Sequence, residues 1–132
     1  MIAVVVVNTA LIRRPEVVVD FVVDEGMLNI CLKNIGDSSA YRVRTIFDKP
    51  FYGLGGEKCI SRMRVFREVA FMPPQKELRQ YIDMLVIYAK RREPMRINAV
   101  VSYRDRDGNR YEDTMAHDLR MYLDLGQAKL VR

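Results

Sequence analysis

The chain has 132 residues, of which 49% are hydrophobic and 30% are charged, with 22 Lys and Arg residues against 17 Asp and Glu residues. This length suits one domain whose core needs no disulfide or metal, and the hydrophobic content excludes a disordered chain. The net charge of +5 permits a nucleic acid or another anionic partner but is too small to require one.

The first segment, MIAVVVVNTALI, is apolar and ends before Arg13-Arg14-Pro15. It is shorter than the roughly 20 residues of a membrane-spanning helix, and it lacks the basic start and clear cleavage site of a signal peptide. Its run of valines favours an extended conformation. We therefore expect residues 1–14 to form an extra strand, within the sandwich or across a homodimer, and the chain to contain no membrane span. The alternative is the end of a clipped anchor. A strand in this segment would indicate a cytoplasmic protein, and an anchor would indicate a truncated form of a membrane-anchored protein.

Two alternating segments follow, separated by a turn. PEVVVDFVVDEG places valines and Phe21 at every second position from Val17 to Val23, so these side chains share one face. MLNICLKN repeats the pattern with its apolar residues from Leu28 to Leu32. The tight turn at Asp24-Glu25-Gly26 makes the pair an antiparallel hairpin.

The two cysteines, Cys31 and Cys59, do not have the spacing of a zinc site. Because nothing in the sequence indicates an oxidising compartment, we expect two partly buried free thiols. A bridge between them is the alternative.

The segment LKNIGDSSAYRVRTIF predicts a corner between two sheets. Asn34 and Gly36 end a strand, and we expect Gly36 to adopt a positive φ. The polar residues 37–39 then make a connection through side-chain hydrogen bonds to nearby backbone. Residues 41, 43, 45 and 47 share one face of the next strand, and residues 42, 44 and 46 share the other. Architecture alone explains this motif, without a ligand.

The middle of the chain is less regular. GLGGEK departs from a phosphate-binding loop, because Cys59 follows Lys58 where Ser or Thr is required. CISRMRVFREVAFM fits either an irregular edge strand or a short helix, and Pro73-Pro74 ends it. We expect a strand over residues 76–82 and a short helical connection over about 83–90.

MRINAVVSYRDRDGNRYEDTMAHDL is the clearest hairpin, with Asp107-Gly108 as its turn. Asp105, Asp107 and Asn109 also have the spacing of the first EF-hand ligands. However, Arg110 occupies the position of the invariant Gly and Ala116 that of the bidentate Glu. The sequence therefore favours a hairpin turn over a calcium loop.

Three stretches carry a family resemblance: LKNIGDSSAYRV, FMPPQKELRQYI and INAVVSYRDRDGNRYEDTMAHDL. They resemble the strand–corner–strand, proline-containing and closing-hairpin segments of bacterial and archaeal immunoglobulin-like modules, including cell-adhesion-related domains. Gln75 stands where a Gly is often found. The resemblance covers most of residues 16–119. It implies an all-β, immunoglobulin-like antiparallel sandwich of about seven strands, with at most a short helix near residues 83–90. The sandwich would span residues 15–123, with a C-terminal tail over 124–132. Such modules serve as spacers, adhesion units or accessory domains.

The sequence offers little for catalysis. The single histidine, His117, falls in the last expected strand, where a satisfied structural imidazole is the common role. The carboxylate pairs Asp24-Glu25 and Glu112-Asp113 are adjacent, so in strands they point to opposite faces. We expect no enzyme activity, no cofactor and no metal.

Two functional hypotheses remain. The first is a structural or protein-interaction module that meets another protein through strand edges or loops. The alternative is weak binding of nucleic acid or another polyanion, although the aromatic residues needed for base stacking are expected in the core. Its surface would consist of basic side chains: Arg42, Arg44, Arg62, Arg64, Arg67, Lys90, Arg91 and Arg92.

Overall fold

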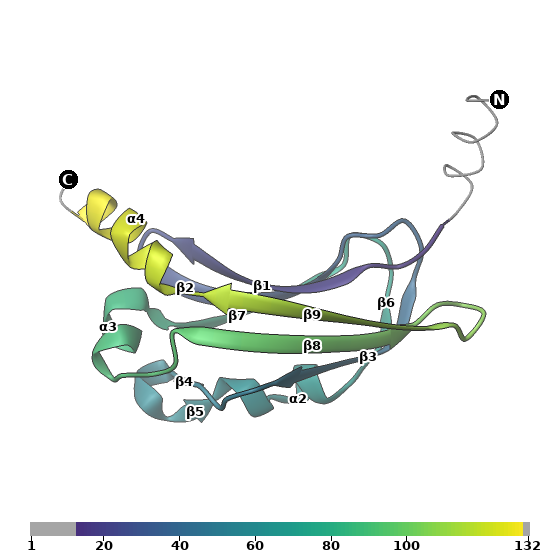
Figure 1. Cartoon of the computed structure of the whole chain (residues 1–132), viewed down its shortest axis with the longest axis horizontal. Helices are drawn as coiled ribbons and strands as arrows, with labels where there is room; N and C mark the ends of the chain where they lie inside the picture. The colour runs from purple at the N-terminus through teal and green to yellow at the C-terminus, as the bar shows by residue number, and fades with distance from the viewer. Residues whose placement is uncertain (1–12, 131–132) are drawn as a thin grey trace.

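A computed structural model describes residues 13–130 and shows a sandwich of two antiparallel sheets (Figure 1). The first sheet has the order β1 (Val17–Asp24), β2 (Met27–Asn34), β7 (Glu77–Met84). The second has the order β6 (Val69–Met72), β3 (Ala40–Phe47), β8 (Arg96–Arg104), β9 (Arg110–Asp118). The predicted all-β class is confirmed. The strand expected near the start of the chain lies outside the described residues.

Short elements surround the two sheets. Between β3 and β6 the chain forms β4 (Tyr52–Gly53), η1 (Leu54–Gly56), β5 (Lys58–Cys59), η2 (Ile60–Arg62) and α2 (Arg64–Arg67). The segment CISRMRVFREVAFM therefore contains both of the structures considered for it, a short helix in α2 and an edge strand in β6. α3 (Leu85–Lys90) directly follows β7, as the sequence predicted. In Figure 1, α2, β4 and β5 lie along the side of the sandwich next to β3.

The chain is more helical at its C-terminal end than expected. A helix, α4 (Arg120–Leu130), includes most of the stretch interpreted as a tail, so the limit of one short helix near residues 83–90 was wrong. Asp118 starts this helix, because its carboxylate accepts hydrogen bonds from the backbone N–H and the guanidinium of Arg120. Arg120 also lowers the pKa of the Asp118 carboxyl.

The core includes the alternating side chains predicted for β1, β2 and β8. Facing residues of the two sheets interdigitate as in other sandwiches, so every second side chain is removed from water. The members of this set are at most 2% exposed: Val17, Val19, Phe21, Leu28, Ile30, Leu32, Ile97, Ala99, Val101 and Tyr103.

β3 departs from the predicted alternation at one point. Its register against β8 shifts between Tyr41 and Arg44, and Arg42 has a φ of 52°. This is a β-bulge, in which one extra residue changes the face on which its neighbours lie. Val43 is buried, whereas Tyr41 packs against the half-exposed Phe71 with ring centroids 5.4 Å apart. The prediction that Tyr41 shares a face with Val43 was therefore wrong.

Asn34 organises the corner between the sheets, and it is fully buried. Its Oδ1 accepts hydrogen bonds from the N–H groups of Glu16 and Gly36, at 3.2 and 3.0 Å. Its Nδ2 donates to the carbonyls of Ser38 and Met72, both at 2.9 Å. All the hydrogen-bonding capacity of this amide is used inside the protein, so its role is architectural.

Gly36 does not have a positive φ, contrary to the sequence-based expectation. Glycine is required at this corner because there is no space for a side chain. A Cβ at this position would lie 2.5 Å from the carbonyl oxygen of Arg14 and from the backbone nitrogen of Glu16. These are rigid backbone atoms, so only glycine lets the incoming chain pass.

The β8–β9 hairpin has the predicted turn, with Tyr103 opposite Tyr111 and Ala99 opposite Met115. Asp105 Oδ1 accepts hydrogen bonds from the N–H groups of Asp107 and Asn109, each at 2.9 Å. Asp105 Oδ2 accepts from the side chains of Asn109 and Tyr111, also at 2.9 Å. These bonds, the Asn109 amide foremost, lower the pKa of Asp105. The carboxylate thus stabilises the turn.

Candidate functional site

The eight basic residues proposed as a polyanion surface come from three separate stretches of the chain. Arg42 and Arg44 extend from β3, whereas Arg62, Arg64 and Arg67 belong to η2 and α2. The remaining three lie at or after the end of α3: Lys90, Arg91 and Arg92. Each group is considered by its own contacts.

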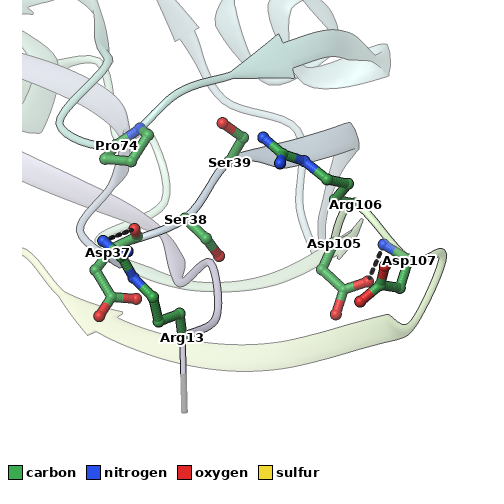
Figure 2. Close-up of a pocket in the computed structure, with 8 residues that line it drawn as sticks. All are labelled: Arg13, Asp37, Ser38, Ser39, Pro74, Asp105, Arg106 and Asp107. Carbon is green, nitrogen blue, oxygen red and sulfur yellow. Dashed lines mark hydrogen bonds between the residues drawn. The ribbon is translucent and has the colours of Figure 1, made fainter. Parts of the chain in front are cut away.

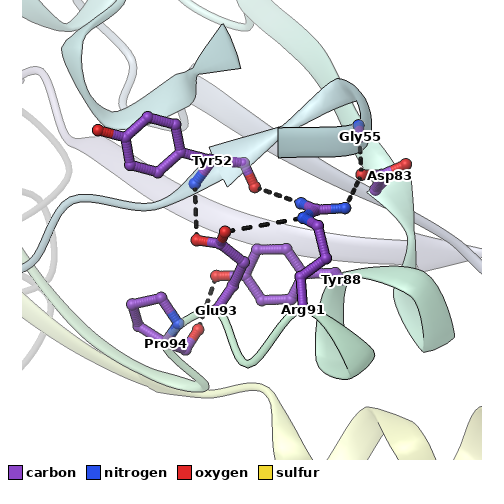
Figure 3. A network of polar contacts seen from close by, with 7 residues as sticks. All are labelled: Tyr52, Gly55, Asp83, Tyr88, Arg91, Glu93 and Pro94. Carbon is purple, nitrogen blue, oxygen red and sulfur yellow. Dashed lines mark hydrogen bonds and ion pairs between the residues drawn. The ribbon is translucent and has the colours of Figure 1, made fainter. Parts of the chain in front are cut away.

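Arg91 belongs to an internal polar network (Figure 3). Its guanidinium donates to the carboxylate of Asp83 at 2.5 Å and to the carbonyl of Tyr52 at 2.8 Å. Glu93 lies 3.7 Å from Arg91 Nε and accepts a hydrogen bond from the N–H of Tyr52 at 3.0 Å. Asp83 also accepts from the N–H of Gly55 at 3.0 Å. This network fastens the β4–η1 loop to β7 and α3, and Arg91 is not free to bind a ligand.

Arg62 and Arg67 border a hollow of about 350 Å³ between β3 and α2. Its floor includes Phe47, Phe66 and the strongly exposed Ile46. No carboxylate lies within 4 Å of either arginine in the described part of the chain. Arg62 and Arg67 are exposed, as are Arg64, Lys90 and Arg92, and none of the five forms an ion pair with a described residue.

A larger hollow of about 410 Å³ lies where the corner meets the β8–β9 turn (Figure 2). Arg13 donates to the carbonyl of Asp37, and the carboxylate of Asp37 accepts from the N–H of Arg14. Asp105 is committed to its own turn. Charges of both signs line this hollow, so it shows no preference for a cation or an anion.

An apolar groove of about 200 Å³ runs beside β7. One wall comes from the inner face of the first sheet and the other from the α2 region. Its lining is Ile30, Leu32, Met63, Val65, Phe66, Leu78, Arg79 and Gln80. β7 is the last strand of its sheet, so this groove adjoins an unpaired strand edge.

A compact basic cluster lies on the outer face of the second sheet, close to the β8–β9 turn. We name it the arginine corner; it consists of Arg42, Arg44, Arg104 and Arg110, and these side chains surround a hollow of about 60 Å³ together with Ser102 and Tyr103. Glu68 contacts two members, with its Oε1 2.9 Å from Arg44 Nε and 3.9 Å from Arg42 Nε.

The sequence interpretation missed two members of the arginine corner, Arg104 and Arg110. A signal for them was present, because these residues flank the predicted Asp107-Gly108 turn and lie directly opposite each other in the ladder. Combining hairpin register with charge would have paired them.

The single histidine and the two cysteines are partly or fully buried. His117 is half-buried on β9, edge-on to Phe21 with ring centroids 5.0 Å apart. Its Nε2 is buried and has no hydrogen-bond partner among residues 13–130, and burial lowers the pKa of the imidazole. The expectation of a structural imidazole with satisfied hydrogen bonds is therefore only partly correct. Both cysteines are free thiols, as predicted, and burial raises the pKa of Cys31, which disfavours the reactive thiolate.

The sequence matches a family described as a domain of unknown function, DUF8453, over residues 2–123. The chain belongs to this family. The match includes every strand of both sheets, the β7 edge and the arginine corner of the DUF8453 domain. No curated protein and no solved structure matches this chain. Within residues 13–130, no helix has the length and apolar character needed to cross a membrane.

Proposed function

We propose that this DUF8453 domain is a non-catalytic protein-interaction module of the immunoglobulin-like type. The strand order supports the second part of this proposal. If the seven long strands are lettered A to G in chain order, the sheets are ABE and DCFG. Immunoglobulin constant domains have sheets ABED and CFG, so the two arrangements differ only in the sheet that holds the fourth strand.

The free edge of β7 is the observation that carries the interaction role. β7 pairs with β2 on one side, and no strand of the described chain pairs with its other side. The second half of that edge is covered by the β4–η1 loop, where a Cβ on Gly53 would lie 2.5 Å from the carbonyl oxygen of Ile82. The first half, residues 77–81, is left for a partner. An unpaired edge binds an extended segment through main-chain hydrogen bonds.

The groove beside this edge defines the partner's chemistry. Leu78 and Val65 lie on its two walls, so it accepts apolar side chains from alternate positions of an added strand. Arg79 lines the groove, where it pairs with Glu77 at 3.0 Å, and α2 places the exposed Arg64 and Arg67 beside Val65 and Phe66. The basic surroundings favour acidic residues at the intervening positions. The proposed partner is an extended segment in which apolar and acidic residues alternate.

A peptide titration tests this proposal. The probe is a nine-residue peptide of alternating Val and Asp, and the control has the same composition with all valines before all aspartates. We expect the alternating peptide to bind and to shift the backbone amide resonances of residues 77–81. Val65→Asp places a charge in the groove without altering a strand and should weaken binding at least tenfold. Ile87→Asp makes the same change at an exposed site on α3 and should not.

Other outcomes would contradict the proposal. Equal binding of both peptides would indicate a charge effect rather than strand addition. Self-association of the protein that Val65→Asp abolishes would assign the β7 edge to a second copy of the chain instead.

A further inference from the structure

We propose that the arginine corner is a binding site for a single phosphate monoester group. The site is separate from the β7 edge, and the inference does not depend on the function proposed for that edge.

The first observation is a like-charge pair across the sheet. Arg104 and Arg110 face each other directly in the β8–β9 ladder. Within residues 13–130, neither has a carboxylate within 4 Å. Like charges at directly opposed positions destabilise an antiparallel pair. A bound anion converts this repulsion into two attractive contacts.

The second observation is the bulge in β3. Arg42 has a φ of 52°, a conformation that residues with a side chain rarely adopt. Bulges commonly re-aim side chains next to binding sites. Here the register shift sets Arg44 opposite Ser102 and leaves Arg42 beside the same hollow. The strained residue is thus one of the four that surround it.

The third observation is the match of size and charge. The hollow holds about 60 Å³, which exceeds the roughly 10–15 Å³ that a cavity needs to hold one water molecule, so there is room for one small oxyanion. The four arginines have two acidic neighbours: Glu68, and Glu112, which lies opposite Ser102 in the ladder. The net charge around the hollow is therefore +2. A phosphate monoester has a charge of about −1.5 to −2 near neutral pH, whereas a carboxylate or a phosphodiester has a smaller negative charge.

The chemistry of the donors agrees with this ligand. Guanidinium groups bind phosphate through paired, planar hydrogen bonds, and Ser102, which carries a hydroxyl donor, lines the same hollow. Glu68 already places one carboxylate oxygen between Arg42 and Arg44, which shows that this side of the corner accepts an anionic oxygen.

Calorimetric titration of the whole chain tests the proposal with inorganic phosphate, a phosphoserine peptide, acetate and a twelve-nucleotide single strand. We expect both phosphate monoesters to bind at least tenfold more tightly than acetate. Inorganic phosphate and the peptide separate the two sources of this group: equal affinities would assign the free anion as ligand, and tighter peptide binding a modified protein. Either result supports the site.

Two double variants make the test specific. Arg104→Gln with Arg110→Gln should weaken phosphate binding at least tenfold, and it should fold because it removes a repulsive pair. Arg62→Gln with Arg67→Gln removes the same charge beside α2 and should change the affinity by less than twofold. If the first variant did not fold, Arg42→Gln with Arg44→Gln would replace it, with the same expected loss.

The proposal would be overturned by equal losses in both double variants, because binding would then follow net charge alone. It would also be overturned if the oligonucleotide bound more tightly than the phosphoserine peptide and both pairs of arginines contributed. That result would indicate an extended polyanion surface.

Discussion

The side chain of Asn34, at the end of β2 in the first sheet, donates a hydrogen bond of 2.9 Å to the carbonyl of Met72, at the end of β6 in the second sheet. The same amide also binds the backbone of the incoming chain and of the connection to β3. One buried side chain therefore holds together four backbone segments where the two sheets meet.

Replacing Asn34 should lower the stability of the domain strongly. Asn34→Ala removes the side-chain partner of two carbonyls and two N–H groups at the corner, and at about 1 kcal/mol for each net hydrogen bond the free energy of unfolding should fall by about 4 kcal/mol. Asn29→Ala is the matched control, because the Asn29 amide makes one hydrogen bond, to the carbonyl of Met27, and should cost about 0.5 kcal/mol or less. Urea unfolding measures both. Similar losses in the two variants would show that the Asn34 contacts are dispensable.

Substitutions at Gly36 and at Gly108 should destabilise the domain for different reasons. Gly36→Ala forces a Cβ against backbone and should destabilise the domain by about 1–3 kcal/mol. Gly108 has a φ of 86° with open space around it, so Gly108→Ala should cost about 1 kcal/mol. Asn tolerates a positive φ better than Ala does, so Asn should be milder than Ala at Gly108 but no better at Gly36. Thermal unfolding of the four variants checks this, and relief by Asn at Gly36 would contradict the steric explanation.

The regular strands could be predicted because burial on one face of a sheet imposes a period of two. This period is visible from Val17 to Val23 and from Ile97 to Tyr103. The β8–β9 turn was equally accessible, since Asp107-Gly108 has strong local preferences. The bulge at Arg42 was not, because AYRVRTIF alternates regularly and nothing in it indicates an extra residue.

The binding surfaces depend on which strands become neighbours, and local sequence does not determine that. β7 is an edge strand only because β6 pairs with β3 in the other sheet. Arg42 and Arg104 share a hollow although 62 positions separate them in the sequence. Gly36 could be predicted only in part. The sequence indicates that glycine is needed there, and only the fold shows that the reason is lack of space.

The stability of the domain should depend on pH through His117. Burial lowers the pKa of this imidazole below its ordinary 6.5, and the nearby carboxylate of Asp20 acts in the opposite direction. The unfolded chain therefore takes up a proton more readily than the folded one. The stabilisation is fully present above pH 6.5 and is lost as the pH falls toward the folded-state pKa.

His117→Phe tests this dependence, because it keeps a ring beside Phe21 and removes the titrating group. We expect the melting temperature of the parent protein to fall between pH 7.5 and pH 5, and the variant to lose less over the same range. Parallel curves for the two proteins would assign the pH dependence to the carboxylates instead.

The Arg91–Asp83 pair should behave as a coupled unit. The two side chains are 21% and 12% exposed, so removing one charge leaves the other poorly solvated. Arg91→Met should destabilise the domain by about 2 kcal/mol, less than the 3–5 kcal/mol of a fully buried pair because water still reaches this one. Adding Asp83→Asn removes the stranded charge and keeps an acceptor for the N–H of Gly55. The double variant should therefore be more stable than Arg91→Met alone, as a double-mutant cycle by urea unfolding would measure. Additive losses would mean that the two residues stabilise the loop independently.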